Sequence, residues 1–175
     1  AGMAGGSYLG REPSVLTGVG SSAPCPAPEP RNMIAACPGA IATQLAAYPS
    51  SMKLRVILNH TSYPMDRSPD ALRVWRRGME ALADCANVAC KISGLPVLGA
   101  PFTLAANKPI ILDTISMFGV ERCMFASNFP VDGLKGSWDY IYTTYKRAVA
   151  DLDQRDQERL FAEHALKFYR IDLPV

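Results

Sequence analysis

The sequence has 175 residues, 49% of them hydrophobic, which is enough to build one packed domain of ordinary size. Its 18 basic residues nearly balance 16 acidic ones, and no basic run is longer than Arg76-Arg77, so neither nucleic acid nor an anionic membrane is expected as a partner. No apolar stretch approaches the roughly 20 residues that span a bilayer. The five cysteines form no C-x-x-C pair, and together these features predict a reduced, cytoplasmic protein.

Residues 1–40 differ in composition from the rest of the chain. They hold 13 glycines or prolines and only four charged residues, without a helical or alternating period. The segment Gly18-Val-Gly20-Ser-Ser-Ala23 matches a dinucleotide-binding fingerprint, but prolines follow at once where that fingerprint needs a helix. We therefore predict two parts, an irregular Gly/Pro-rich segment at 1–40 and a folded unit at 41–175.

From residue 41 onward, short apolar runs alternate with segments of helical period. In chain order the predicted elements are a short helix at 41–47, a strand at 54–59, a helix that begins after Ser68, a strand at 88–93, a helix that ends at Gly119, a strand at 123–127, a helix at 138–150 and a last helix capped by Asp153. Strands that are apolar on both sides and alternate with helices are typical of a parallel sheet. The fold class is thus α/β, either an open three-layer sheet or a piece of a (β/α)8 barrel.

Polar residues follow the first and third of these strands, where enzymes with parallel sheets carry their chemistry. His60 comes directly after the first strand, and could ligate a divalent metal, shuttle a proton or hydrogen-bond a loop backbone. Asn128 could hold a substrate carbonyl or hydroxyl. Asp132 could act as a base or a ligand, or could instead cap a helix or face solvent.

The middle strand carries Lys91 and Ser93 on the same side. Lys91 either points into the interior of a barrel, where it would attract an anionic substrate, or forms a buried ion pair. Cys90 and Cys123 lie within apolar strands, which raises the pKa of a thiol and argues against a nucleophile. His164 lies on the apolar side of the last helix, where we expect a packing or capping role.

Four stretches of the chain, taken together, resemble the amidohydrolase family, in particular the TIM-barrel hydrolases related to sugar-acid and dicarboxylate lactonases. The resemblance covers about residues 40–172. The matching stretches are 56–61 (VILNHT), 87–94 (NVACKISG), 118–132 (FGVERCMFASNFPVD) and 165–171 (ALKFYRI).

The resemblance implies that water attacks a carbonyl carbon, with a divalent metal (zinc or manganese) or cationic side chains polarising the oxygen. It places a ligand or acid/base histidine at His60. We expect the substrate contacts at Lys91, Ser93 and Ser127. The family's H-x-H pair is absent, and the position of its water-activating aspartate falls on Asn128, whose amide has no basic lone pair. Asp132 could take over that role.

The resemblance also implies a partial (β/α)8 TIM barrel, its C-terminal half, because a complete barrel takes about 250 residues. We expect a fragment of a longer gene product, or else a homo-oligomer that covers the open sheet edge. The predicted function is opening of a lactone of a small sugar acid or dicarboxylate, weak or absent in this chain alone. A related decarboxylase or amide hydrolase and a non-catalytic half-barrel for assembly or binding stay open as alternatives.

Overall fold

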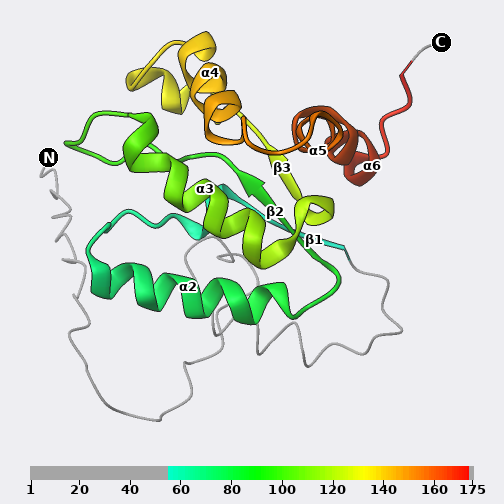
Figure 1. Ribbon diagram of the computed structural model, residues 1–175, viewed down its shortest axis with the longest axis horizontal. Coiled ribbons are helices and arrows are strands. Elements are labelled where there is room, and N and C mark those ends of the chain that lie inside the picture. Colours follow the sequence, from blue (N-terminus) through cyan, green and yellow to red (C-terminus); the bar gives the residue numbers. More distant parts are fainter. Residues whose placement is uncertain (1–54, 174–175) are drawn as a thin grey trace, which may run out of the picture.

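A three-stranded parallel sheet forms the centre of the computed structural model, which describes residues 55–173 (Figure 1). Its strands are β1 (Val56–Leu58), β2 (Val88–Ile92) and β3 (Cys123–Phe125), in the order β1-β2-β3. Leu58 lies opposite Cys90, and Cys90 lies opposite Cys123. Because the strands are parallel, their carboxyl ends meet at one edge of the sheet.

The three helices α2 (Pro69–Ala83), α3 (Leu104–Phe118) and α4 (Trp138–Ala148) each begin at a residue whose hydroxyl accepts a backbone N–H. These N-caps are Ser68, Thr103 and Ser137, with hydrogen bonds of 3.3, 3.2 and 3.1 Å. Helix α3 packs between α2 and α4 (Figure 1). Each strand is therefore followed by a helix, as the alternating sequence pattern predicts.

The last helical segment is interrupted, although its apolar pattern predicts one continuous helix. It comprises α5 (Gln154–Glu158), a π-helical turn (Arg159–Glu163) and α6 (His164–Tyr169). Asp153 caps it as predicted, with its Oδ1 accepting the Asp156 N–H at 2.8 Å. The π-helical turn lies against β3, where the Phe161 ring stacks on Phe125 with centroids 4.6 Å apart.

The hydrophobic core joins alternate residues of the strands to the helices. Cys90 and Ile92 of β2 are fully buried in it together with Ile110 and Ile111 of α3. By strand alternation Lys91 points from the opposite face of the sheet. Its Nζ lies 6.0 Å from the centroid of the Tyr169 ring, and no ion pair of Lys91 occurs within residues 55–173, so the alternative of a buried pair gains no support there.

The predicted strands and helices are present in the described part of the chain, with β1 and β3 shorter than expected. The predicted helix at 41–47, the irregular segment and its fingerprint lie outside the described residues. Cys85, Cys90 and Cys123 are free thiols, and burial raises the pKa of Cys123 to about 12, the direction expected for a thiol within an apolar strand. Over the same range, no helix has the length and apolar character to cross a membrane.

Candidate active site

The candidate site lies at the carboxyl ends of the three strands. The His60 Nδ1 and the Ser93 Oγ are 2.8 Å apart in a hydrogen bond that joins the end of β1 to the end of β2. Ser93 is fully buried, so this bond fixes the orientation of the imidazole ring. The structure thus brings together His60 and Ser93, which the sequence analysis selected as separate candidates.

Gly94 makes this close approach possible. Its φ is +58°, and a Cβ at this position would lie 2.7 Å from His60 Nδ1 and 2.9 Å from His60 Cβ. Both distances are shorter than a van der Waals contact, and the backbone conformation itself favours glycine. The sequence analysis did not identify Gly94, although a glycine directly after a strand is a signal of close backbone approach.

His60 begins a left-handed turn of four residues, with φ between 48° and 59° from His60 to Tyr63. Such a run is costly for non-glycine residues and needs support from its surroundings. Thr61 is fully buried, its hydroxyl donates to the His60 carbonyl at 2.7 Å, and the Trp75 Nε1 donates to the Thr61 carbonyl at 2.7 Å. Helix α2 therefore holds the turn that presents His60.

The end of β3 contributes an amide–carboxyl pair. The Asn128 Nδ2 donates to the Asp132 Oδ1 at 2.7 Å, and Asn128 has a positive φ of 53°. Asp132 is only 4% exposed, and its Oδ2 makes no hydrogen bond of normal geometry within residues 55–173. The expectation that Asp132 faces solvent is therefore wrong.

The environment moves the pKa values of both titratable groups. Burial raises the pKa of Asp132, against the opposing effects of the Asn128 amide and the Gly94 backbone N–H. Burial lowers the pKa of His60, and the charge of Lys91 lowers it further. The neutral imidazole of His60, which can accept a proton, is thus favoured over its charged form, while Asp132 holds its proton more readily than an exposed carboxyl group.

Ser127 and Lys91 are the remaining predicted substrate contacts. The Ser127 Oγ accepts the Phe129 N–H at 3.2 Å, which stabilises the loop after β3. Lys91 lies near enough to influence the pKa of His60. Direct contact of either residue with a substrate stays a prediction.

Metal ligands are scarce around His60. Within residues 55–173 no group of three or more histidine, cysteine, aspartate or glutamate side chains is placed to hold a metal ion. Catalytic zinc sites use about three protein ligands. A zinc or manganese ion at His60 would therefore need ligands from outside the described residues, and the described residues alone do not fit such an ion.

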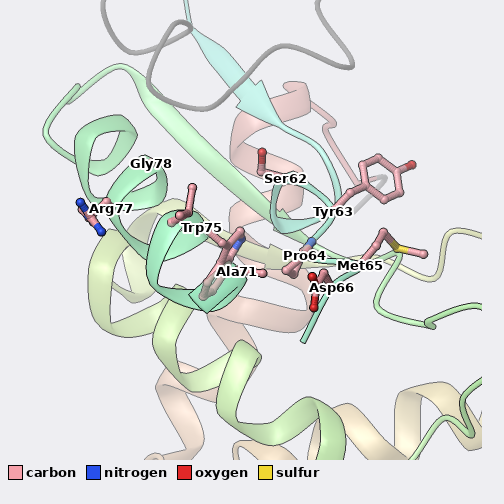
Figure 2. Close-up of a pocket in the computed structure, with 10 residues that line it drawn as sticks. Ser62, Tyr63, Pro64, Met65, Asp66, Ala71, Trp75, Arg77 and Gly78 are labelled. Atoms are coloured by element: carbon pink, nitrogen blue, oxygen red, sulfur yellow. The ribbon is translucent and has the colours of Figure 1, made fainter. Parts of the chain in front are cut away.

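A separate apolar groove of about 590 Å³ lies between the turn after β1 and α2 (Figure 2). Tyr63, Met65 and Trp75 are among the residues that line it. Neither His60 nor Asp132 lines this groove, so it is not where the candidate acid/base groups act.

Comparison with known proteins identifies relatives in one family. The family model described as Amidohydrolase matches residues 14–171. An uncharacterized protein, y4mH, of Sinorhizobium fredii is 41% identical over 118 residues, which are 67% of this chain and 39% of that protein. An L-fucono-1,5-lactonase of Burkholderia ambifaria is 32% identical over 127 residues, covering 70% of this chain and 43% of that protein.

A solved structure supports the same relationship. The crystal structure of an amidohydrolase from Burkholderia multivorans with bound HEPES has a TM-score of 0.68 and 25% sequence identity, covering 77% of this chain and 50% of that chain. A second crystal form of an amidohydrolase from the same organism, with bound Zn, has a TM-score of 0.68 and 24% identity, which shows likeness of fold. The chain thus spans half or less of the length of these relatives. On these matches and on the geometry above, the chain belongs to the amidohydrolase family.

Proposed function

We propose that the chain is the C-terminal half of a (β/α)8 barrel that hydrolyses the cyclic ester of a small sugar acid or dicarboxylate. The observation that carries the proposal is the convergence of His60, Ser93, Asn128 and Asp132 at the carboxyl ends of three parallel strands. In barrel enzymes this is the edge that carries the catalytic residues. The name L-fucono-1,5-lactonase of two relatives supports lactone hydrolysis as the reaction.

In this proposal His60 acts on the attacking water. In the tautomer whose Nδ1–H donates to the Ser93 Oγ, the other ring nitrogen, Nε2, has the free lone pair and accepts the proton as the water oxygen adds to the lactone carbonyl carbon. The tetrahedral intermediate then collapses with breakage of the ring C–O bond. The leaving alkoxide oxygen takes up a proton, and the product is the open hydroxy acid.

Asp132 supplies the second acid/base group. The aspartate expected at position 128 is replaced by an amide, and that amide holds the Asp132 carboxyl group through the bond between Asn128 Nδ2 and Asp132 Oδ1. The raised pKa of Asp132 suits a group that donates a proton to the leaving oxygen and later recovers it. Lys91 would attract the negative charge of a sugar acid or dicarboxylate.

The test is hydrolysis of a panel of lactones by the 175-residue chain, with the release of acid measured in a pH-stat. We expect the chain to open the lactone slowly, but faster than buffer alone. After subtraction of the buffer rate, His60→Asn and Asp132→Asn should each lower the rate of opening by about a hundredfold or more. Asp139→Asn, an exposed carboxylate on α4, should retain the rate. A rate that is equal in all four proteins would contradict the assignment of the site.

The alternatives are separated in the same experiment. Release of carbon dioxide from carboxylated substrates, or of amine from amides, at rates that exceed lactone opening would favour the decarboxylase or amide hydrolase. No turnover of any substrate, with a stable assembly, would favour the non-catalytic half-barrel.

The rest of the barrel is proposed to come from another segment. Within the described sheet β1 and β3 are the two edge strands, and an edge strand can pair with a further strand. Reading the genomic DNA upstream of codon 1 for an in-frame H-x-H segment tests whether a longer gene product supplies it. Sedimentation of the purified chain tests the other source, a second copy.

A further inference from the structure

Tyr63 lies against His60 on the side of the candidate site that faces solvent. The two rings have centroids 4.6 Å apart and are tilted by 50°. Tyr63 is 39% exposed, whereas Ser93 is fully buried and Asp132 is only 4% exposed. A substrate that approaches the His60 ring from solvent therefore also meets the Tyr63 side chain.

Hydrogen bonds fix the backbone around Tyr63. Its N–H donates to the His60 carbonyl, and its own carbonyl accepts the Met65 N–H, both at 2.8 Å. The Trp75 indole holds the same left-handed turn through the Thr61 carbonyl. Figure 2 shows that the Tyr63 ring extends from this turn away from α2, although the residue also lines the apolar groove. A polar group on a segment restrained in this way needs little reorganisation when a substrate binds.

The Tyr63 hydroxyl is a hydrogen-bond donor within reach of the charge on Asp132. Burial raises the pKa of Tyr63 above its ordinary value, and the Asp132 carboxylate raises it further. The phenol therefore keeps its proton near neutral pH. The hydroxyl makes no hydrogen bond with another group of residues 55–173, so a substrate oxygen would not have to displace a partner there.

The proposed reaction calls for a hydrogen-bond donor at the carbonyl oxygen of the lactone. As water adds to the carbonyl carbon, the electron pair of the C=O bond moves onto this oxygen, and a donor aimed at it lowers the barrier. His60 and Asp132 already serve the water and the leaving oxygen. The Ser93 Oγ is engaged with His60, and the Lys91 Nζ lies near the Tyr169 ring.

We propose that the Tyr63 hydroxyl is a further catalytic group, which donates a hydrogen bond to the lactone carbonyl oxygen as the water adds. The inference rests on the proposed function, because it adds a group to the same reaction. The phenol keeps its proton throughout, while the His60 Nε2 takes the proton of the water and the carbonyl oxygen gains the electron pair. That pair then re-forms the carbonyl, the ring C–O bond breaks, and the leaving oxygen takes its proton from Asp132.

The test compares the 175-residue chain with Tyr63→Phe, which keeps the aromatic ring against His60 and removes only the hydroxyl. The ligand is a cyclic phosphonate, whose anionic oxygen is carried by a tetrahedral centre as in the intermediate. We expect it to bind in a calorimetric titration, and to bind about tenfold to a hundredfold more weakly to Tyr63→Phe. Tyr169→Phe, which removes an exposed phenol of α6, should bind it as the unmodified chain does.

Two further measurements separate catalysis by Tyr63 from support of the site. In Tyr63→Phe the kcat for lactone opening should fall by about a hundredfold or more with KM unchanged. The NMR signals and the pKa of the His60 ring should stay as in the unmodified chain, because the ring that contacts His60 is retained.

Three results would overturn the inference: no binding of the phosphonate to the unmodified chain, equal binding to Tyr63→Phe, or weaker binding together with displaced His60 signals. The last result would mean that Tyr63 only supports His60. The titration requires no turnover, so it decides the role of Tyr63 even where the chain opens no lactone, a result that would count against the proposed reaction alone.

Discussion

Replacement of Gly94 by alanine tests how the site is assembled. The new Cβ would lie 2.7 Å from His60 Nδ1, and the contact at 2.9 Å with His60 Cβ means that rotation of the ring cannot relieve it. Left-handed backbone at a non-glycine residue costs about 1–2 kcal/mol. Displacement of the imidazole from Ser93 loses a further hydrogen bond, about 1 kcal/mol. We expect Gly94→Ala to lower the free energy of unfolding by about 2–3 kcal/mol.

Gly99→Ala is the matched control for that measurement. Gly99 also has a positive φ, of +76°, but a Cβ there would have no neighbour within 4 Å. Gly99→Ala should therefore lower the free energy of unfolding only by the cost of a left-handed backbone at alanine, about 1–2 kcal/mol. Urea denaturation of both variants, with the His60 ring signals followed by NMR, separates the two contributions. Equal losses in the two variants, or unchanged His60 signals in Gly94→Ala, would refute the reasoning.

Two further predictions concern buried polar groups outside the site. The Tyr145 hydroxyl is buried without a partner within residues 55–173, so Tyr145→Phe should leave the melting temperature unchanged or raise it, and a clear decrease would reveal a bonded hydroxyl. Burial, aided by Lys167, lowers the pKa of His164 from its ordinary value of 6.5, so its neutral form is favoured in the folded state. Stability should be full above about pH 6.5 and decline as the pH falls below it, because the unfolded chain then binds more protons. Between pH 7 and pH 5 the urea midpoint of unfolding should fall less in His164→Gln than in the unmodified chain. An equal dependence of the midpoint on pH in the two proteins would contradict this prediction.

Local signals in the sequence were sufficient to place most helices and strands. Ser68 and Asp153 cap helices because their side chains accept N–H groups that a helix leaves unpaired, and this depends on nearby residues only. Gly119 ends α3 for a similarly local reason, since its positive φ of 76° is accessible to glycine. The order of strands in the sheet agrees with the tendency of consecutive parallel strands, joined by a helical crossover, to lie side by side.

The features that sequence reasoning missed depend on contacts between distant residues. The left-handed turn after β1 consists of residues with no preference for that conformation, and Trp75 supports it from 14 positions away. The π-helical turn at Arg159–Glu163 carries the same apolar pattern as a continuous helix. The sequence analysis did not consider Arg67, because no local signal distinguishes it; two of its nitrogens are buried where it packs against the loop after β2.

The replacement of the expected aspartate by Asn128 need not remove acid/base chemistry, because the structure moves a carboxyl group into its neighbourhood. Burial shifts the pKa of Asp132 upward from 3.8 and that of His60 downward from 6.5, so the two values approach each other. A raised pKa favours a carboxyl group that can donate a proton, and a lowered pKa favours a neutral imidazole that can accept one. Both groups adjoin Gly94, which follows β2: a Cβ there would contact His60, and the Gly94 backbone N–H acts on Asp132. The amide at position 128 therefore holds the carboxyl group of Asp132 in place, and in the proposed reaction that carboxyl group takes the acid/base role four residues along the chain.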